Sequence, residues 1–172
     1  MTDERRPQTW HDAREKAQRL DANASLDTRF SEVQHLAERF STAHPDPLDR
    51  ARAIHRYVRD TIGYRRDPGG IEEFADSGHV LHVREDDCDG KARLFVALCR
   101  AAGLLARIRP VATPARGFYH VQAEVDPFRA GRWMLAELIL HGVELGQGAS
   151  DAPRDAAGRR WLAGPGARPV GK

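Results

Sequence analysis

Cys88, His120 and Glu137 are the residue types, in the chain order, that a thiol-dependent catalytic set requires. Cys88 directly precedes a helical pattern of apolar residues, so its thiol is predicted to lie at a helix N-terminus. Unpaired N–H groups and the helix dipole favour a thiolate there, and a nearby imidazolium would lower the thiol pKa further. A histidine can accept the thiol proton, and a carboxylate can orient that histidine. The three residues therefore predict a nucleophile, a general base and an orienting group.

Each of these residues also has a structural interpretation. A cysteine that opens a helix is often only structural, and a histidine in a half-exposed strand is often a surface residue. Glu137 is harder to explain in this way, because it stands in an otherwise apolar segment and a buried carboxylate needs a partner. The spacing of the three residues together favours catalysis.

His120 and Glu137 fall in two successive strand-like segments. If residues 126–131 form the loop between them, Val125 lies opposite Arg132 and His120 lies directly opposite Glu137. Residues opposed in this way have Cβ atoms about 4.5–5.5 Å apart, within reach of a hydrogen bond between the side chains. A slip by one residue would send the two side chains to opposite faces, so the prediction depends on the register.

The elements that must position these residues follow from apolar periodicity. Residues 1–24 predict a peripheral helix or a partly ordered arm, and the apolar stripe from Leu26 to Phe40 predicts one helix across that range. Asp46 suits the N-cap and Pro47 the first position of a further helix. Residues 64–83 read as a long connection, a kind of segment that is often functional.

The helix that follows Cys88 is predicted to be capped by Asp86 or Asp87 and to end at Gly103. Beyond Gly103 the apolar period changes to two, which is typical of strands. The segment after Gly142 is rich in Gly, Ala, Pro and Arg and is predicted to pack loosely. The predicted strands are Leu104–Val111, Phe118–Val125 and Arg132–Leu140.

The two cysteines, Cys88 and Cys99, require separate explanations. They stand 11 residues apart, and on one helix that spacing corresponds to about 16 Å. A disulfide needs Cα atoms within about 4.4–6.8 Å, so neither a disulfide nor a shared zinc site is expected. Cys99 falls on the apolar face of the helix and is predicted to be an inert core thiol.

Composition limits the classes of function. Charged residues make up 30% of the 172 residues, and the net charge of +2 is spread along the chain. Nucleic-acid binders usually concentrate basic charge on one face, so no nucleic-acid partner is expected. The rival interpretation is a module that binds phosphate or nucleic acid through its arginines. The sequence shows no secretory signal. It also shows no apolar run of roughly 20 residues, the length that spans a bilayer. We therefore expect a cytoplasmic protein without a membrane partner.

Three ordered motifs resemble the transglutaminase-like superfamily, part of the wider papain-like group of thiol enzymes, across roughly residues 47–140. The segment Arg84–Cys88 and its helix are similar to the family's nucleophile segment. The stretch His120–Val125 resembles its histidine strand, and Gly131–Trp133 followed by Glu137 resembles its last element. The chain departs from the family pattern at three positions. Asp86 stands where a Gly is usual, Gln122 replaces an aromatic residue, and Glu137 replaces an Asp.

This resemblance implies an α+β fold in which the nucleophile helix packs on an antiparallel sheet, with extra helices before it. It divides the chain into an N-terminal helical extension (1–46), a catalytic core (47–140) and a partly flexible C-terminal extension (141–172). The implied activity is acyl transfer through a thioester, as a cysteine protease or amidase that hydrolyses a peptide or isopeptide amide, or as an acyltransferase to an amine. A catalytically silent binding domain with the same fold is the alternative.

The implied catalytic triad is Cys88, His120 and Glu137, with a protein or peptide amide as the partner. No cofactor or metal is expected, and the sequence contains no acidic cluster of the EF-hand type. The backbone N–H of Cys88 is one expected oxyanion donor; Tyr64, His82 and Gln122 are candidates for the second. The oligomeric state is not predicted. The residues expected to line the substrate site are Asp87, Asp89, Tyr64, Gln122 and Trp133.

Overall fold

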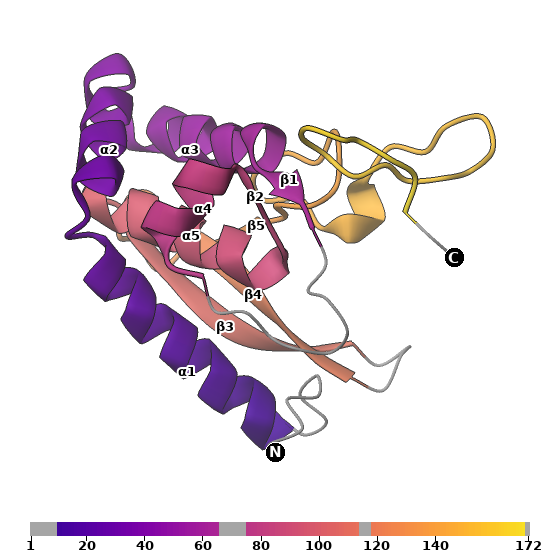
Figure 1. Cartoon of the computed structure of the whole chain (residues 1–172), viewed down its shortest axis with the longest axis horizontal. Coiled ribbons are helices and arrows are strands. Elements are labelled where there is room, and N and C mark those ends of the chain that lie inside the picture. Colours follow the sequence, from indigo (N-terminus) through magenta and orange to yellow (C-terminus); the bar gives the residue numbers. More distant parts are fainter. Residues whose placement is uncertain (1–9, 66–74, 114–117, 171–172) are drawn as a thin grey trace.

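The computed structural model describes residues 10–65, 75–113 and 118–170. At residues 112–113 and 118–120 it describes the backbone but not the side chains. None of the described helices is long and apolar enough to span a membrane. The elements in chain order (Figure 1) are α1 (Trp10–Asp27), α2 (Ser31–Ala43), α3 (Pro47–Thr61), β1 (Gly63–Tyr64), α4 (Ser77–Val83), β2 (Glu85–Asp86), α5 (Cys88–Ala101), β3 (Leu105–Thr113), β4 (Phe118–Asp126), β5 (Met134–Ala136) and a 3-10 turn (Ala149–Asp151).

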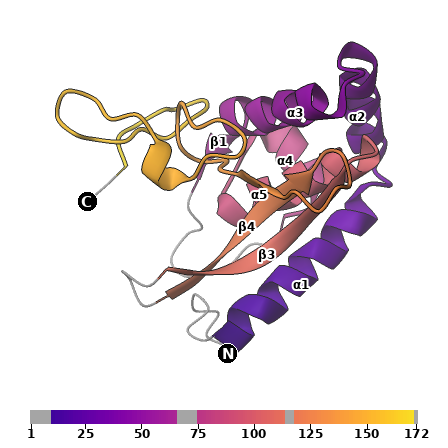
Figure 2. The same ribbon diagram turned by 180° about the vertical axis from the view of Figure 1, so that it is seen from behind.

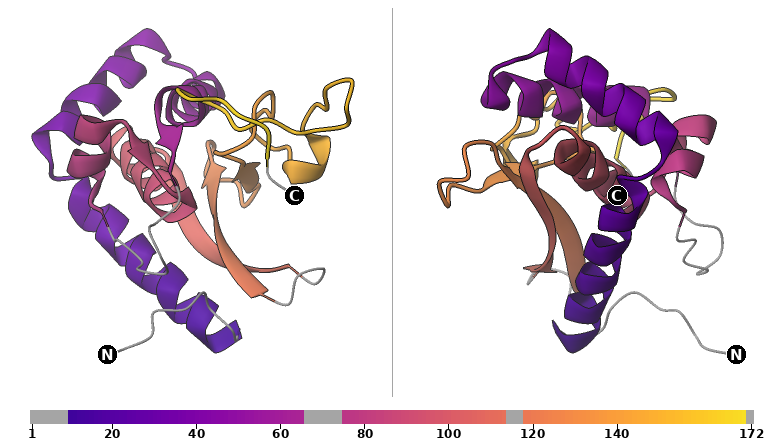
Figure 3. Two further views of the ribbon diagram at one scale, coloured as in Figure 1. Left: turned by 45° about the vertical axis from the view of Figure 1, so that its right-hand side comes forward. Right: turned by 90° about the vertical axis from the view of Figure 1, so that its left-hand side faces the viewer.

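The helix α5 is the centre of the fold. It packs on the antiparallel sheet, whose strand order is β3-β4-β5, and it lies between this sheet and the helices α2 and α3 (Figure 3). Every residue of α5 from Asp89 to Cys99 is buried, as expected for a helix with neighbours on all sides. The predicted α+β arrangement, with the helix that begins at Cys88 packed on an antiparallel sheet, is confirmed.

The N-terminal helix differs from its prediction. α1 continues to Asp27 and α2 starts at Ser31, so a single helix from Leu26 to Phe40 is wrong; Leu26 is 56% exposed. Nor is α1 peripheral, because it lies along β3 and packs against α5 (Figure 2). Its buried face consists of small or aliphatic residues: Ala13, Ala17, Leu20 and Ala24.

Ion pairs also join α1 to α5. Arg93 donates to both carboxylate oxygens of Asp27, at 2.6 Å and 2.7 Å, and both side chains are buried. Asp27 accepts a further bond of 2.6 Å from Ser77 Oγ at the start of α4, so one carboxylate joins three helices. The ion pairs between α1 and α5 in the described residues are Lys16–Asp89, Asp21–Arg100 and Asp27–Arg93.

The helix signals around α3 and α5 are confirmed. Asp46 caps α3, because its Oδ1 accepts bonds of 2.9 Å from the backbone N–H groups of Leu48 and Asp49. Asp87, rather than Asp86, caps α5. Gly103 has a φ of +79°, the left-handed conformation that favours glycine after a helix.

Two segments are more ordered than their composition predicts. The sequence predicts that residues 64–83 are a connection, but they contain the end of strand β1, at Tyr64, and the helix α4. The strand β1 pairs in parallel with β2. Residues 66–74 lie outside the described residues. Loose packing after Gly142 is wrong for the described residues up to 170. Val143 is fully buried, and bridges pair Leu140 with Leu162 and Trp161 with Pro169.

The hairpin of β4 and β5 has a different register from the predicted one. Val125 pairs with Met134, not with Arg132, so the partner residues are shifted by two. Within the loop, the Asp126 carboxylate accepts a bond of 2.6 Å from the Gly131 N–H. The predicted pairing of His120 with Glu137 is therefore wrong: continued by one residue beyond Ala123 and Ala136, this register sets Gln122 opposite Glu137. A shift of two still leaves every residue on its predicted face, because strand side chains alternate.

Candidate active site

Cys88 is the first residue of α5, as the sequence predicts. The helix start is stabilised by Asp87, whose Oδ1 accepts bonds of 2.8 Å from the Asp89 N–H and 3.1 Å from the Gly90 N–H. Asp87, a predicted substrate-site residue, is therefore a helix cap. These two N–H groups serve the cap and do not face the thiol.

The residue that replaces the family's usual glycine, Asp86, is accommodated by a second glycine. The Asp86 side chain is buried, and its Oδ1 accepts a 2.7 Å bond from the Asp87 N–H. A Cβ atom added at Gly90 would lie 1.9 Å from Asp86 Oδ2, far inside van der Waals contact. Sequence reasoning missed Gly90; its signal was a glycine in the first turn of a strongly apolar helix.

The thiol of Cys88 lies beside an ion pair. Its Sγ is 3.6 Å from Oδ1 of Asp89, and Oδ2 of Asp89 is 2.5 Å from Lys16 Nζ of α1. Burial and then the carboxylates of Asp89 and Asp87 raise the pKa of the Cys88 thiol well above its ordinary value, and Lys16 partly opposes them. This direction is opposite to the predicted one; the imidazolium on which that prediction also relied, at His120, lies outside the described side chains.

A small cavity joins Cys88 to the predicted orienting residue. It has a volume of about 20 Å³, comparable to the space of one water molecule. Gln122 of β4 and Glu137, just beyond β5, both line it, so α5 and the sheet bring Cys88, Gln122 and Glu137 together. The other lining residues are Ala92, Val121, Ala123, Ala136, Leu138 and Ile139.

His120 lies in β4, in register with Val111 of β3 and two residues before Gln122. An even spacing places positions 120 and 122 on one face of the strand. The side chain of His120 lies outside the described part of the structure, so its contact with Cys88 and Glu137 stays a prediction.

Glu137 is held through its backbone by a buried histidine. His55 of α3 donates from Nε2 to the Glu137 carbonyl oxygen at 2.7 Å, because a carbonyl can only accept. His55 is fully buried, and burial lowers its pKa to about 4, so the ring is neutral at physiological pH. The side-chain Oε1 of Glu137 accepts a 2.9 Å bond from the Ile139 N–H, which fixes the carboxylate near the cavity. His55 carried no sequence signal for this contact, because 82 residues separate it from Glu137.

A buried lysine connects α5 to the end of α3. Lys91, one turn after Cys88, donates bonds of 2.6 Å to the Ile62 carbonyl and 3.3 Å to the Arg59 carbonyl at the end of α3. The side chain is completely buried, and this burial lowers its pKa to about 8 although Asp60 and Glu137 oppose the shift. Lys91 thus fixes the start of α5 relative to α3.

The remaining predicted residues lie elsewhere. Trp133 stacks under the Arg107 guanidinium, whose Cζ is 3.7 Å from the ring centroid, and does not line the Cys88 cavity. Tyr64 pairs through its backbone with Asp86 in the two-stranded sheet. Cys99 is buried in the core and burial raises its pKa, consistent with an inert thiol.

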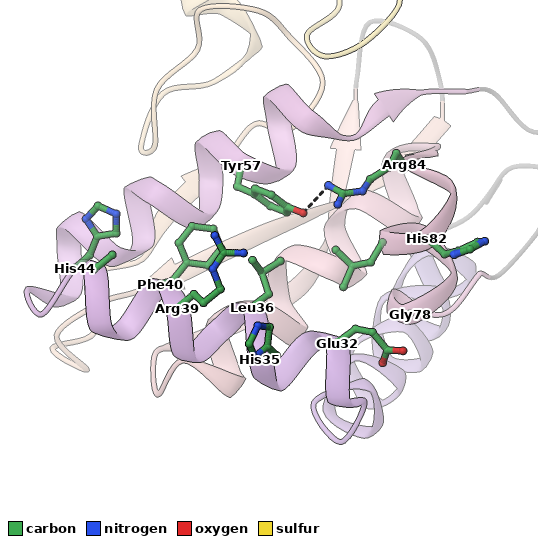
Figure 4. A pocket seen from close by; sticks show the side chains of 12 residues that line it. Glu32, His35, Leu36, Arg39, Phe40, His44, Tyr57, Gly78, His82 and Arg84 are labelled. Atoms are coloured by element: carbon green, nitrogen blue, oxygen red, sulfur yellow. Dashed lines mark hydrogen bonds between the residues drawn. The ribbon is translucent and has the colours of Figure 1, made fainter.

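A larger cavity, of about 640 Å³, lies between α2, α3 and α4 and shares no residue with the one at Cys88. Leu36 and Phe40 line it, and the Arg84 guanidinium donates a 2.7 Å bond to the Tyr57 hydroxyl at its edge (Figure 4). His82, a predicted oxyanion donor, lines this cavity instead. Gln122 is the candidate donor that the structure places beside Cys88.

Potential metal ligands occur together at one place in the described residues. Ligand atoms of Asp87, Cys88 and Asp89 lie within 4.8 Å of one another. Their oxygens already accept bonds from backbone N–H groups and from Lys16. The arrangement therefore fits a capped helix start better than a cation site.

Comparisons with known proteins identify the family and the fold. The family model described as the transglutaminase-like superfamily matches residues 34–138, more than half of the chain. A search of the curated proteins finds no match. Among solved structures, a candidate cysteine protease from Cytophaga hutchinsonii has a TM-score of 0.50 and 21% identity, over 62% of this chain and 36% of that one.

The periplasmic domain of TgpA from Pseudomonas aeruginosa, in one structure bound to ethylmercury, has a TM-score of 0.48 and 18% identity. The matches to its two structures cover 64% and 67% of this chain and 46% of the TgpA chain. The chain thus spans less than half the length of these solved relatives. At this level of identity the likeness concerns the fold.

Proposed function

Because the chain belongs to the transglutaminase-like superfamily, we propose that it is a cysteine-dependent acyl-transfer enzyme with Cys88 as the nucleophile. The observation that supports this best is the joint position of Cys88, Gln122 and Glu137 around one cavity at the start of the central helix. These residues come from distant parts of the chain, and a core thiol would not require a carboxylate there.

The proposed reaction proceeds in two stages. Cys88 Sγ attacks the carbonyl carbon of an amide while its proton passes to His120; the backbone N–H of Cys88 and the Gln122 amide stabilise the oxyanion. The C–N bond then breaks, His120 returns the proton to the leaving nitrogen, and a thioester remains. Water or an amine attacks the thioester and regenerates the thiol. Glu137 orients His120 throughout.

The raised pKa of the Cys88 thiol favours a first stage in which proton transfer to His120 accompanies the attack on the substrate. The proposed substrate is a peptide or isopeptide amide of a protein, and we favour water as the acceptor.

The second candidate is a catalytically silent binding domain, and two observations favour it. The pKa of the thiol is raised, and the cavity beside it among the described residues measures about 20 Å³, less than the volume of an acyl group.

A peptide mixture that contains isopeptide bonds would separate the two candidates. New amino termini, measured by mass spectrometry, report hydrolysis, and incorporation of a fluorescent primary amine reports transfer. We expect turnover by the unaltered chain and by Cys99→Ala, the matched cysteine control, and none by Cys88→Ala or His120→Ala. Equal turnover by Cys88→Ala, or no turnover by any form, would refute the enzymatic proposal.

A further inference from the structure

We propose that Lys16 of α1 is a positioning residue for the thiol chemistry: by pairing with Asp89, it limits the negative charge that Cys88 meets on ionisation. This inference deepens the proposed function and rests on Cys88 being the nucleophile.

The Asp89 carboxylate bridges the lysine and the thiol. Lys16 Nζ lies 2.5 Å from Oδ2, and Cys88 Sγ lies 3.6 Å from Oδ1 of the same group. The side chains of Lys16 and Asp89 are only 14% and 10% exposed. Salt and water screen such partly buried charges much less than surface charges, so the pair acts on the thiol at close range.

The charges around Cys88 are predominantly negative. Asp89 and Asp87 raise its pKa, whereas Lys16 is the charged group from the described residues that lowers it. Without Lys16, a thiolate would form directly beside an uncompensated carboxylate. The titratable groups near the thiol site on the packed elements, among the described side chains, are Lys16 (α1), Asp86 (β2), Asp87 and Asp89 (α5 and its cap) and Glu137 (after β5). The strand β4 carries His120, whose side chain lies outside the description.

Lys16 comes from outside the segment that the family shares. The family match begins at residue 34, and α1 ends at Asp27. The helix α1 runs along β3 and packs against α5 (Figure 2), and the pair with Asp89 places the lysine at the start of α5. A helix added before the family segment therefore supplies a charge to the site.

The test is the pH dependence of alkylation at Cys88. Iodoacetamide reacts with the thiolate, and mass spectrometry at intervals between pH 6 and 10 reports the rate at this residue; Cys88→Ala gives the background from Cys99. For Lys16→Met we expect the profile to move to higher pH and the rate at pH 7.5 to fall about tenfold, as for one unit of thiol pKa. Lys16→Arg should restore the profile. Arg14→Met, which removes an exposed charge from the same helix, should leave it unchanged.

Asp89→Asn provides the opposite perturbation. It should move the profile to lower pH, and in this background Lys16→Met should have little further effect. Coincident profiles for the unaltered chain and a folded Lys16→Met variant would overturn the inference. If Lys16→Met does not fold, as judged by circular dichroism, Asp89→Asn alone decides, and an unchanged profile there overturns it.

Alkylation needs no turnover, so the two proposals can fail separately. A shifted profile in a chain that cleaves no amide would refute the enzymatic function while the link from Lys16 to the thiol stands. Amide turnover with unshifted profiles would refute the link alone.

Discussion

The contact between Asp86 and Gly90 allows a stability test with a defined sign. Substituting Gly90→Ala in a helix would ordinarily stabilise the fold by about 1 kcal/mol. Here the new Cβ would lie 1.9 Å from Asp86 Oδ2 and 2.3 Å from its Cγ. The Asp86 side chain is short and buried, and moving it would disturb its bond to the Asp87 N–H. Overpacking of this kind costs about 1–3 kcal/mol, and loss of a charged hydrogen bond adds a similar amount.

We therefore expect Gly90→Ala to lower the free energy of unfolding by about 1–5 kcal/mol. In an Asp86→Gly background the obstructing carboxylate is absent, and Gly90→Ala should stabilise the fold by up to about 1 kcal/mol. The coupling between the two positions is then about 2–6 kcal/mol, large for a pair of point substitutions.

Urea unfolding of the four proteins of this cycle, followed by circular dichroism, measures the coupling. The iodoacetamide profile of Cys88 in the Gly90→Ala variant adds a local measurement at the helix start. If Gly90→Ala destabilises both backgrounds equally, the contact with Asp86 is not the reason for this glycine.

Three further perturbations have defined outcomes. Asp27→Asn leaves the Arg93 charge buried without a counter-ion and should lower the free energy of unfolding in urea by about 3 kcal/mol. Asp27→Leu combined with Arg93→Met removes both charges and should lower it less. Equal losses would contradict a role for the charge. Burial lowers the pKa of His55 to about 4 in the folded chain. As the pH falls, His55 of the unfolded chain, with its ordinary pKa, therefore binds a proton before His55 of the folded chain does. Stability from this group is complete above pH 6.5 and lost as the pH falls toward 4, by about 3 kcal/mol. A His55→Gln variant keeps a donor and should lose that much less stability between pH 7 and pH 4; parallel losses would disprove the assignment. Glu137→Gln should lower kcat for amide cleavage about 100-fold or more with little change in KM, since it weakens the orientation of the base; an unchanged kcat would remove Glu137 from the proposed triad.

Local signals predicted the helices around the site well. Asp46 and Gly103 act within one turn of their own helix ends, so the residue type alone predicts their positions. The long helix α1 was misjudged for the opposite reason. Its buried face is mostly alanine, which contributes little to an apolar pattern although it packs closely.

The register and the surroundings of the thiol depend on contacts that no local pattern contains. The strand sequences do not reveal the hairpin shift, because a shift of two keeps the same side chains on the same face of the sheet. The raised pKa of Cys88 follows from its burial and from neighbouring carboxylates, whereas the sequence indicated only the helix start. Lys16 meets Asp89 across 73 residues, and its importance depends entirely on the tertiary fold.

The ion pairs of α1 have a consequence for where this chain can be cut. A truncated chain that begins at residue 34, where the family match begins, would lack Asp27, Asp21 and Lys16. The buried guanidinium of Arg93 would then have no counter-ion, at a cost of about 3–5 kcal/mol, and one side of β3 and α5 would be open to water. Because whole domains are stable by only about 5–15 kcal/mol, such a fragment should not fold independently. We therefore expect the cooperative folding unit to be larger than the segment that the family model matches, and to include the helix before it.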